Sequence, residues 1–245
     1  MPEILKTQGL VLSKINFQES SKIVRIYTND FGKMAFLVKA ARSAKSKSGN
    51  IVDVLNQIEF VFYKKESRDL QLITESTLIR FFPNIKANYE SIIYGSAIVE
   101  LLDKLLHENE KNERLFRGVI RILELINANP DRSGMYFVKF LFFFLDELGY
   151  RLETEKCASC SSLLSHSSSV GFNFEEGFLC SECRKNKLIN YSFSAEQFKI
   201  VQCLSSRVSN CGESADLIEK LIGFFEKYLS YQIDEFKEIK SLKLI

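Results

Sequence analysis

The sequence predicts an α+β protein in which a five-stranded N-terminal barrel precedes an all-helical domain that carries a four-cysteine module. Three observations predict this arrangement. The first 80 residues read as short strands, apolar residues recur at helical spacing after residue 81, and two Cys-x-x-Cys pairs interrupt the helical part. With 245 residues, 46% of them hydrophobic, the chain is long enough for one large or two modest domains. We expect two domains, residues 1–80 and 81–245, with the cysteine module at about 151–190.

Five segments of the first domain are rich in β-branched and aromatic residues and are separated by turn residues. These predicted strands are 5–14, 21–28, 33–38, 57–64 and 70–78. A longer polar stretch, residues 39–50, follows the third strand. Five strands with a long connection after the third favour a small closed barrel of the OB-fold type, although the pattern also permits an SH3-like barrel or an open sheet.

Helical periodicity dominates the rest of the chain. Pro83 ends the last strand, and helices are expected over about 92–106, 113–127, 135–148 and 215–231. Gly149 is expected to end the third of these helices, and Ser194 is a capping candidate for a further one. The most apolar stretch, Met135–Leu145, is far shorter than the ~20 residues that cross a bilayer. Because no secretory signal opens the chain either, we expect a cytoplasmic protein with no membrane partner.

Two Cys-x-x-Cys pairs are the strongest chemical signal in the sequence. Cys157 and Cys160 form the first pair, Cys180 and Cys183 form the second, and 19 residues separate them. Two intervening residues let both thiolates of a tight turn face one ion, and the second turn completes a tetrahedron. Four thiolates leave no open position for a reactive water, so we expect one structural Zn²⁺ per chain. The alternatives are an iron site with the same ligands, a redox pair and four unrelated core cysteines.

The other two cysteines, Cys203 and Cys211, lack such a pattern. A cytoplasmic chain favours metal binding or burial over disulfides, and we expect both residues to be ordinary structural cysteines.

A basic, acid-free segment is the second chemical signal. Residues 1–80 hold 13 Lys and Arg against 8 Asp and Glu, and residues 31–52 contain no acid. Such a segment can place several cations along a phosphate backbone, and Tyr27, Phe31 and Phe36 would stack bases if they face outward, although Phe36, inside the apolar run 33–38, is expected to be core. The alternative is a solvated connection. We expect DNA contacts from four residues of this segment: Lys39, Arg42, Lys45 and Lys47.

Motifs of common enzyme classes are missing. The sequence contains no phosphate-binding glycine loop, no HExxH, no GxSxG and only two histidines. We therefore expect a protein that is not an enzyme. A protein–protein adaptor without direct DNA binding and a nucleic-acid-modifying enzyme with an unrecognised site are the competing interpretations.

The sequence resembles the bacterial RecO recombination-mediator family over essentially its whole length. The N-terminal signature comprises the turn Phe17–Ser21, Thr28, Gly32 and the segment Val38–Arg42, in which the family commonly has Gly where this chain has Ala40 or Ala41. The second signature is a Phe/Leu-rich helix that ends in Leu-Gly-Tyr shortly before Cys157.

The resemblance implies a DNA repair and recombination protein whose OB-fold binds single- and double-stranded DNA and promotes annealing. It implies work with RecR and with the acidic tail of single-stranded-DNA-binding protein (SSB) to load RecA recombinase at gaps, in the nucleoid region of the cytoplasm. Lys39 and Arg42 match the family's basic segment. The helix face of Arg114, Arg117 and Arg121, at positions i, i+3 and i+7, is our own candidate for the SSB tail; a solvated helix face is the alternative.

Overall fold

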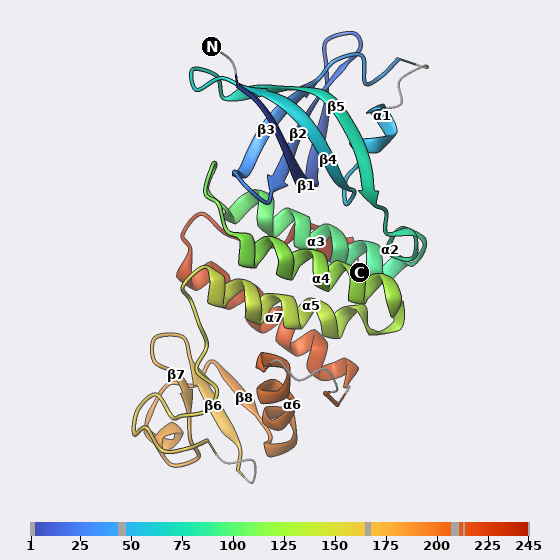
Figure 1. Cartoon of the computed structure of the whole chain (residues 1–245). Helices are drawn as coiled ribbons and strands as arrows, with labels where there is room; N and C mark the ends of the chain where they lie inside the picture. The colour runs from blue at the N-terminus through green and yellow to red at the C-terminus, as the bar shows by residue number, and fades with distance from the viewer. Residues whose placement is uncertain (1–2, 44–47, 165–167, 207–210, 213, 245) are drawn as a thin grey trace. The chain divides into compact units, whose positions relative to one another are not determined.

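The structure is a computed structural model that describes residues 3–43, 48–164, 168–206, 211–212 and 214–244 (Figure 1). It divides into two compact units. Unit 1 comprises Met1–Ser133 together with Ile239–Ile245, and unit 2 comprises Gly134–Glu238. Unit 1 extends beyond residue 80 because helices pack on the barrel and the end of the chain returns to them. A separate domain over residues 1–80 stays a prediction.

The N-terminal barrel is closed, as the strand pattern predicted. Its strands are β1 (Glu3–Phe17), β2 (Ser21–Thr28), β3 (Gly32–Val38), β4 (Gln57–Lys64) and β5 (Leu70–Arg80). Their order is β1-β2-β3-β5-β4; β3 and β5 run parallel and all other neighbours are antiparallel. The expected five-stranded OB-fold barrel is thus confirmed. Strand β1 is longer than predicted because its first part pairs with β4 and its second part pairs with β2, which closes the barrel.

Aromatic side chains fill the barrel. Phe36 and Phe62 are fully buried, and Phe60 is 1% exposed. The ring centroid of Phe36 lies 4.9 Å from that of Phe60 and 5.2 Å from that of Phe62, both edge to face, which is a favoured aromatic geometry. A short helix, α1 (Ser48–Ile51), lies between β3 and β4 in the chain.

Three helices complete unit 1 beside the barrel: α2 (Pro83–Ala87), α3 (Tyr89–Leu105) and α4 (Glu113–Ala128), with a 3₁₀ turn at Pro130–Arg132. Asn88 and Asn112 cap α3 and α4, because each side-chain oxygen accepts a bond from a backbone N–H in the first turn. Helix α3 crosses one end of the barrel (Figure 1).

A buried lysine joins the barrel to α3. Lys33 is only 5% exposed, and its Nζ donates to the carbonyl oxygen of Asp103 at 2.6 Å, in the last turn of the helix. A cation is favourable there because the final carbonyls of a helix lack intrahelical donors. Burial lowers the pKa of Lys33. The backbone of β3 also binds the loop that follows α3, because the carbonyl of Lys33 accepts the N–H of Asn109 at 2.9 Å.

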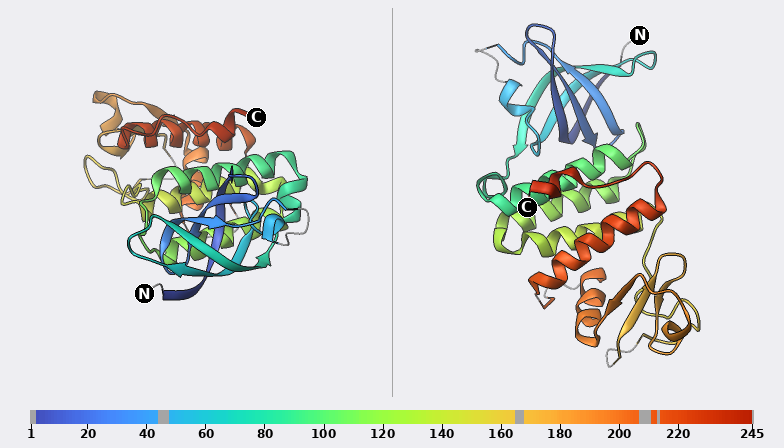
Figure 2. Two further views of the ribbon diagram at one scale, coloured as in Figure 1. Left: turned by 90° about the horizontal axis from the view of Figure 1, so that it is seen from above. Right: turned by 180° about the vertical axis from the view of Figure 1, so that it is seen from behind.

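The end of the chain binds to α3, where the 3₁₀ segment Lys240–Leu244 packs (Figure 2). The carboxylate of Glu100 accepts the backbone N–H groups of Lys240 and Ser241, both at 2.8 Å, and the Ser241 hydroxyl at 2.7 Å. Burial acts to raise the pKa of Glu100, but these bonds and one from Lys104 outweigh it, so the pKa lies below its usual value. We call this attachment the C-terminal clasp.

Unit 2 contains three α-helices and a small sheet. The helices are α5 (Ser133–Glu147), α6 (Ala195–Ser205) and α7 (Ala215–Gln232); the strands, in the order β7-β6-β8, are β6 (Val170–Asn173), β7 (Gly177–Leu179) and β8 (Tyr191–Phe193). Gly149 ends α5 with φ +86° and donates to Asp146, while Tyr150 donates to Leu145, the pattern of a glycine C-cap. Ser194 and Gln197 form a capping box on α6, as the sequence predicted.

The small sheet was not predicted, because its strands are only three or four residues long and show no sustained alternation. It shares an aromatic core with α6 and α7. The ring of Phe172 in β6 lies 4.8 Å from Phe178 in β7 and 4.8 Å from Phe224 in α7. Phe178 lies 5.2 Å from Phe198 in α6. The cysteine module and the last two helices of unit 2 are therefore packed as one body.

Cys203 and Cys211 form a disulfide bond. The expectation that they are unlinked structural cysteines is wrong, because eight positions of separation across the end of α6 bring their Cα atoms to 5.6 Å, within disulfide range. Among the described residues, every helix falls short of the length and apolarity that a bilayer crossing demands.

Candidate functional site

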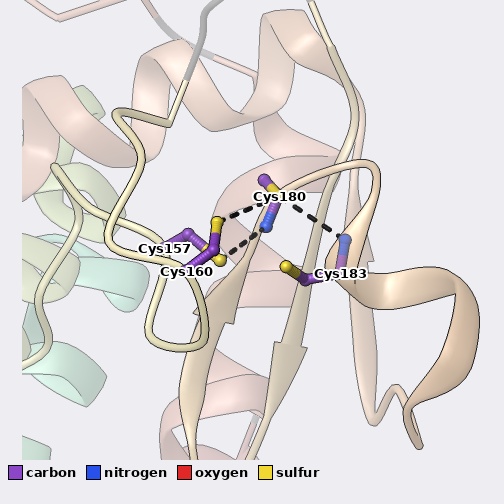
Figure 3. Close-up of side chains that lie close together, drawn as sticks. All are labelled: Cys157, Cys160, Cys180 and Cys183. Carbon is purple, nitrogen blue, oxygen red and sulfur yellow. Dashed lines mark hydrogen bonds between the residues drawn. The ribbon is translucent and has the colours of Figure 1, made fainter.

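Four cysteine sulfurs of unit 2 converge on one point (Figure 3). The Sγ atoms of Cys157, Cys160, Cys180 and Cys183 all lie within 4.8 Å of one another, and those of Cys160 and Cys180 are 3.9 Å apart. Sulfurs 2.3 Å from a tetrahedral ion would be about 3.8 Å from each other. The four thiols therefore already have nearly the spacing that a four-coordinate metal ion requires.

Two loops supply the four thiols (Figure 3), and backbone hydrogen bonds shape each loop. In the first loop the N–H of Cys157 donates to Ser162 O at 2.8 Å, and the N–H of Ser161 donates to Cys157 O at 2.9 Å. In the second, the N–H of Cys183 points to the sulfur of Cys180 at 3.5 Å. The N–H of Cys180 points to the sulfur of Cys157 at 3.4 Å and so joins the loops. N–H groups aimed at sulfur stabilise the thiolate form that binds metals.

The pKa values of Cys160 and Cys183 are shifted in opposite directions. The hydroxyl and backbone N–H of Ser162 lower the pKa of Cys160 to about 6; the hydroxyl lies 3.0 Å from the sulfur. Hydrogen bonding to Cys160 and Cys180 raises the pKa of Cys183 to about 12. Negative charge on one sulfur thus keeps a proton on its neighbour. A divalent cation at the centre would remove this conflict, so the donor set fits a metal ion.

The basic segment after β3 is only partly described. Lys39 and Arg42 are exposed, whereas Lys45 and Lys47 lie outside the described residues. Arg42 is held at the β1–β2 turn: its backbone N–H donates to Ser20 O at 2.8 Å and its guanidinium donates to Gln18 O at 3.2 Å. Ala40 has φ +54°, a region that costs a non-glycine residue about 1–2 kcal/mol. A glycine would avoid this cost, because it lacks a Cβ.

The aromatic part of the DNA interpretation needs correction. Tyr27 is 1% exposed and Phe36 is fully buried, so neither can stack on a base. Phe31 is partly buried and packs against the barrel core. Lys33, the first cation of the acid-free stretch, binds α3 instead of facing a ligand. Of the described cations in this stretch, Lys39 and Arg42 are the ones available to an anion.

Arg114, Arg117 and Arg121 are all exposed on α4, as the helical spacing predicted. Arg117 and Arg121 line a groove of about 590 Å³ beside the barrel. The neighbouring apolar residues Leu115, Phe116 and Val119 are at most 4% exposed, so they offer little surface to the apolar end of a peptide. Lys6, Asp30, Glu59 and Glu124 share the groove, so its charges balance.

Two features of these sites went unpredicted. Ser162, two residues beyond the first cysteine pair, carries the hydrogen bonds that favour the Cys160 thiolate; the short Cys-x-Ser spacing could have indicated it. Lys22 was also missed, because a single lysine at the second position of a predicted strand gives no charge signal, although it lies two residues from Ser20, whose carbonyl accepts the N–H of Arg42.

Known proteins similar to this chain are DNA repair proteins. The family described as Recombination protein O N terminal matches residues 1–82, and the family described as Recombination protein O C terminal matches residues 86–243. "DNA repair protein RecO" of Chloroherpeton thalassium is 28% identical over 256 residues, which cover 98% of this chain and 97% of the relative. The protein of the same name from Caldicellulosiruptor saccharolyticus is 32% identical over 187 residues, which cover 75% of this chain and 73% of the relative. The chain therefore belongs to the RecO family of DNA repair proteins.

Proposed function

We propose that this protein is a non-enzymatic recombination mediator. It binds single- and double-stranded DNA through the barrel, anneals single strands and, together with RecR, helps to load RecA onto SSB-coated DNA. It works in the cytoplasm at the nucleoid. One structural zinc ion, bound by the cysteine quartet of Cys157, Cys160, Cys180 and Cys183, stabilises unit 2. Family membership across both parts of the chain supports the proposal. The single structural observation that carries it is the exposure of Lys39 and Arg42 on a segment without acids.

The basic segment is expected to bind phosphates with little sequence preference. If Lys39, Arg42, Lys45 and Lys47 each neutralise one phosphate of a single strand, log K should fall with log salt concentration at a slope of about −2.8 from this segment. Replacing Lys39 and Arg42 by alanine should weaken binding to all sequences alike and reduce the slope by about 1.4. Fluorescence anisotropy at several salt concentrations measures both effects.

A matched variant distinguishes a local contact from a change in total charge. Lys65→Ala with Arg68→Ala removes two exposed cations from the β4–β5 turn and should leave the slope close to that of the wild type. Circular dichroism should show both variants folded, since exposed cations contribute little to stability. An unchanged slope in a folded Lys39/Arg42 variant would favour the adaptor interpretation over the mediator.

The α4 face is our proposed site for the SSB tail. An acidic peptide with a hydrophobic end would meet Arg117 and Arg121 in the groove and Arg114 at its edge. A labelled synthetic peptide of this kind should bind the triple Arg→Ala variant about tenfold more weakly, because exposed ion pairs contribute about 0.2–1 kcal/mol each. The Lys65/Arg68 variant is again the control. Equal affinity for all three proteins would move the tail site elsewhere.

A further inference from the structure

A second cationic site lies on the barrel beyond the basic segment. It is a pocket of about 460 Å³ between the barrel and α2, and its lining includes Lys14 of β1, Lys22 of β2, Lys86 of α2, Asp53 and Phe81. These residues lie far apart in the first third of the chain, and the closure of the barrel brings them together. Neither the sequence analysis nor the family match assigns a role to them.

The pocket holds three ammonium groups and one carboxylate, and two of the three ammonium groups contact that carboxylate. The Nζ of Lys14 lies 2.5 Å from Asp53 Oδ1, and that of Lys86 lies 3.8 Å from Asp53 Oδ2. Lys22 donates to the carbonyl of Gly49 at 2.9 Å, a neutral partner. The lining therefore has a net charge of about +2 and favours an anion. Burial, and then repulsion from Lys14, lowers the pKa of Lys22, so its charge is under-compensated.

The cations of the pocket continue into the basic segment. The charge of Arg42 contributes to the lowered pKa of Lys22, and that of Lys14 contributes to the lowered pKa values of both Lys22 and Lys86, after burial in each case. The geometry agrees: Lys14, Lys22 and Lys86 line one pocket, and the carbonyl of Ser20, two residues before Lys22, accepts the backbone N–H of Arg42 at 2.8 Å, so these cations form a row from the pocket to the basic segment. A row of this kind matches the spaced phosphates of a nucleic-acid strand better than it matches a single small anion.

An exposed aromatic ring lies at the edge of the same pocket. Phe82 is 1% exposed and anchors the chain before α2, which leaves the adjacent Phe81 48% exposed. The Nζ of Lys86 lies 4.7 Å from the centroid of the Phe81 ring. Leu78, 41% exposed, adds further apolar surface. A ring exposed beside cations is the combination that binds an unpaired base and its phosphate in single-strand-binding proteins.

We propose that this pocket binds one unpaired nucleotide of single-stranded DNA, with its base on the Phe81 ring and its phosphate at Lys14, Lys22 and Lys86. The proposal rests on the DNA binding proposed above and adds a strand preference to it. A paired base is stacked inside the duplex and cannot reach the ring unless it is unstacked, which costs a few kcal/mol. Duplex DNA would therefore use the phosphate contacts without the ring.

Abasic DNA separates the base contact from the phosphate contact. The probes are a labelled thymidine strand of about ten nucleotides, within the range of single-strand sites, and an abasic strand of equal length. Phe81→Ala in the full chain should weaken thymidine-strand binding about 5- to 150-fold, because stacking contributes about 1–3 kcal/mol per base. Its affinity for the abasic strand and for duplex DNA should change by less than about twofold. Lys86→Gln should weaken binding of all three DNAs.

Three further variants complete the design. Phe81→Tyr keeps the ring and should retain the wild-type affinity, whereas Phe81→Leu keeps apolar bulk without the ring and should behave like Phe81→Ala. Tyr89→Ala removes another exposed ring outside the pocket lining and should leave all affinities unchanged. Circular dichroism checks folding.

The outcomes separate this proposal from the proposed function. Equal loss on thymidine and abasic strands, or no loss on either, overturns the nucleotide pocket; if the Lys39/Arg42 variant still weakens DNA binding, the mediator function stands. If the wild type binds no DNA at all, both fail. If the Phe81 variants weaken only the binding of an acidic peptide, the pocket serves a protein partner and the proposal is wrong.

Discussion

Replacing Cys157 by serine should abolish stoichiometric metal binding and unfold unit 2. Cys157 is 2% exposed, and its sulfur also accepts the N–H of Cys180, so serine removes a ligand and the link between the two loops. Structural zinc contributes apparent binding free energies of roughly 10–16 kcal/mol in small peptides, which is comparable to the whole stability of a domain, about 5–15 kcal/mol. Because the module shares its aromatic core with α6 and α7, these helices should lose their packing as well.

Elemental analysis and thermal unfolding measure this result. The wild type should carry one metal ion per chain, identified as zinc, and should lose stability when a strong chelator is added. The control is the double variant Cys203→Ser, Cys211→Ser, which removes two cysteines of the same unit without touching the quartet and should keep its metal. A full complement of metal in Cys157→Ser, or none in zinc-supplied wild type, would show that the quartet is not a metal site.

Gly32→Ala should destabilise unit 1 by roughly 2–5 kcal/mol. Gly32 has φ +72°, which costs alanine about 1–2 kcal/mol, and an added Cβ would lie 2.2 Å from the carbonyl oxygen of Glu110. The added Cβ clashes with a backbone atom, which cannot rotate away as the end of a flexible side chain could. Overpacking therefore adds about 1–3 kcal/mol to the conformational cost. Because Glu110 belongs to the α3–α4 connection, the strain should affect the barrel and these helices together.

Gly149→Ala provides the matched control. Gly149 has φ +86° but nothing within 4 Å of an added Cβ, so this variant should incur only the conformational cost of about 1–2 kcal/mol. Chemical denaturation followed by circular dichroism gives both values. An equal loss of unfolding free energy in the two variants would contradict this prediction. It would mean that the backbone around Gly32 or Glu110 can move to accept the added Cβ without further cost.

Local patterns in the sequence predicted local structure well. The enrichment in β-branched and aromatic residues between turn signals located β2 and β4 residue for residue, and the Cys-x-x-Cys spacing identified four sulfurs that the fold brings within 4.8 Å. Both depend on neighbours within a few residues, which is where propensity and spacing act. The Leu-Gly-Tyr motif likewise predicted the end of α5, because only the conformation of one glycine is involved.

Features that depend on distant partners were not predictable in this way. Lys33 reads as a free cation until α3, 70 positions later, supplies the carbonyl of Asp103. The Lys14, Lys22 and Lys86 pocket requires the closure of the barrel and the placement of α2. Cys203 and Cys211 were misinterpreted because the compartment argued against disulfides, whereas the bond reflects proximity at the end of α6. In each case the missing information is tertiary geometry.

Because of the C-terminal clasp, the stability of one contact in unit 1 depends on whether unit 2 is folded. Unit 2 is inserted in unit 1, so its roughly 100 residues connect Ser133 to the segment that binds Glu100. While unit 2 is folded, the distance between its two ends is fixed. If it unfolds, it becomes a flexible tether, and closing a tether of about 100 residues costs up to about 4 kcal/mol of chain entropy. Folding of the inserted unit therefore raises the effective concentration of the C-terminal segment at α3, and coupling between the units requires no contact beyond the chain itself.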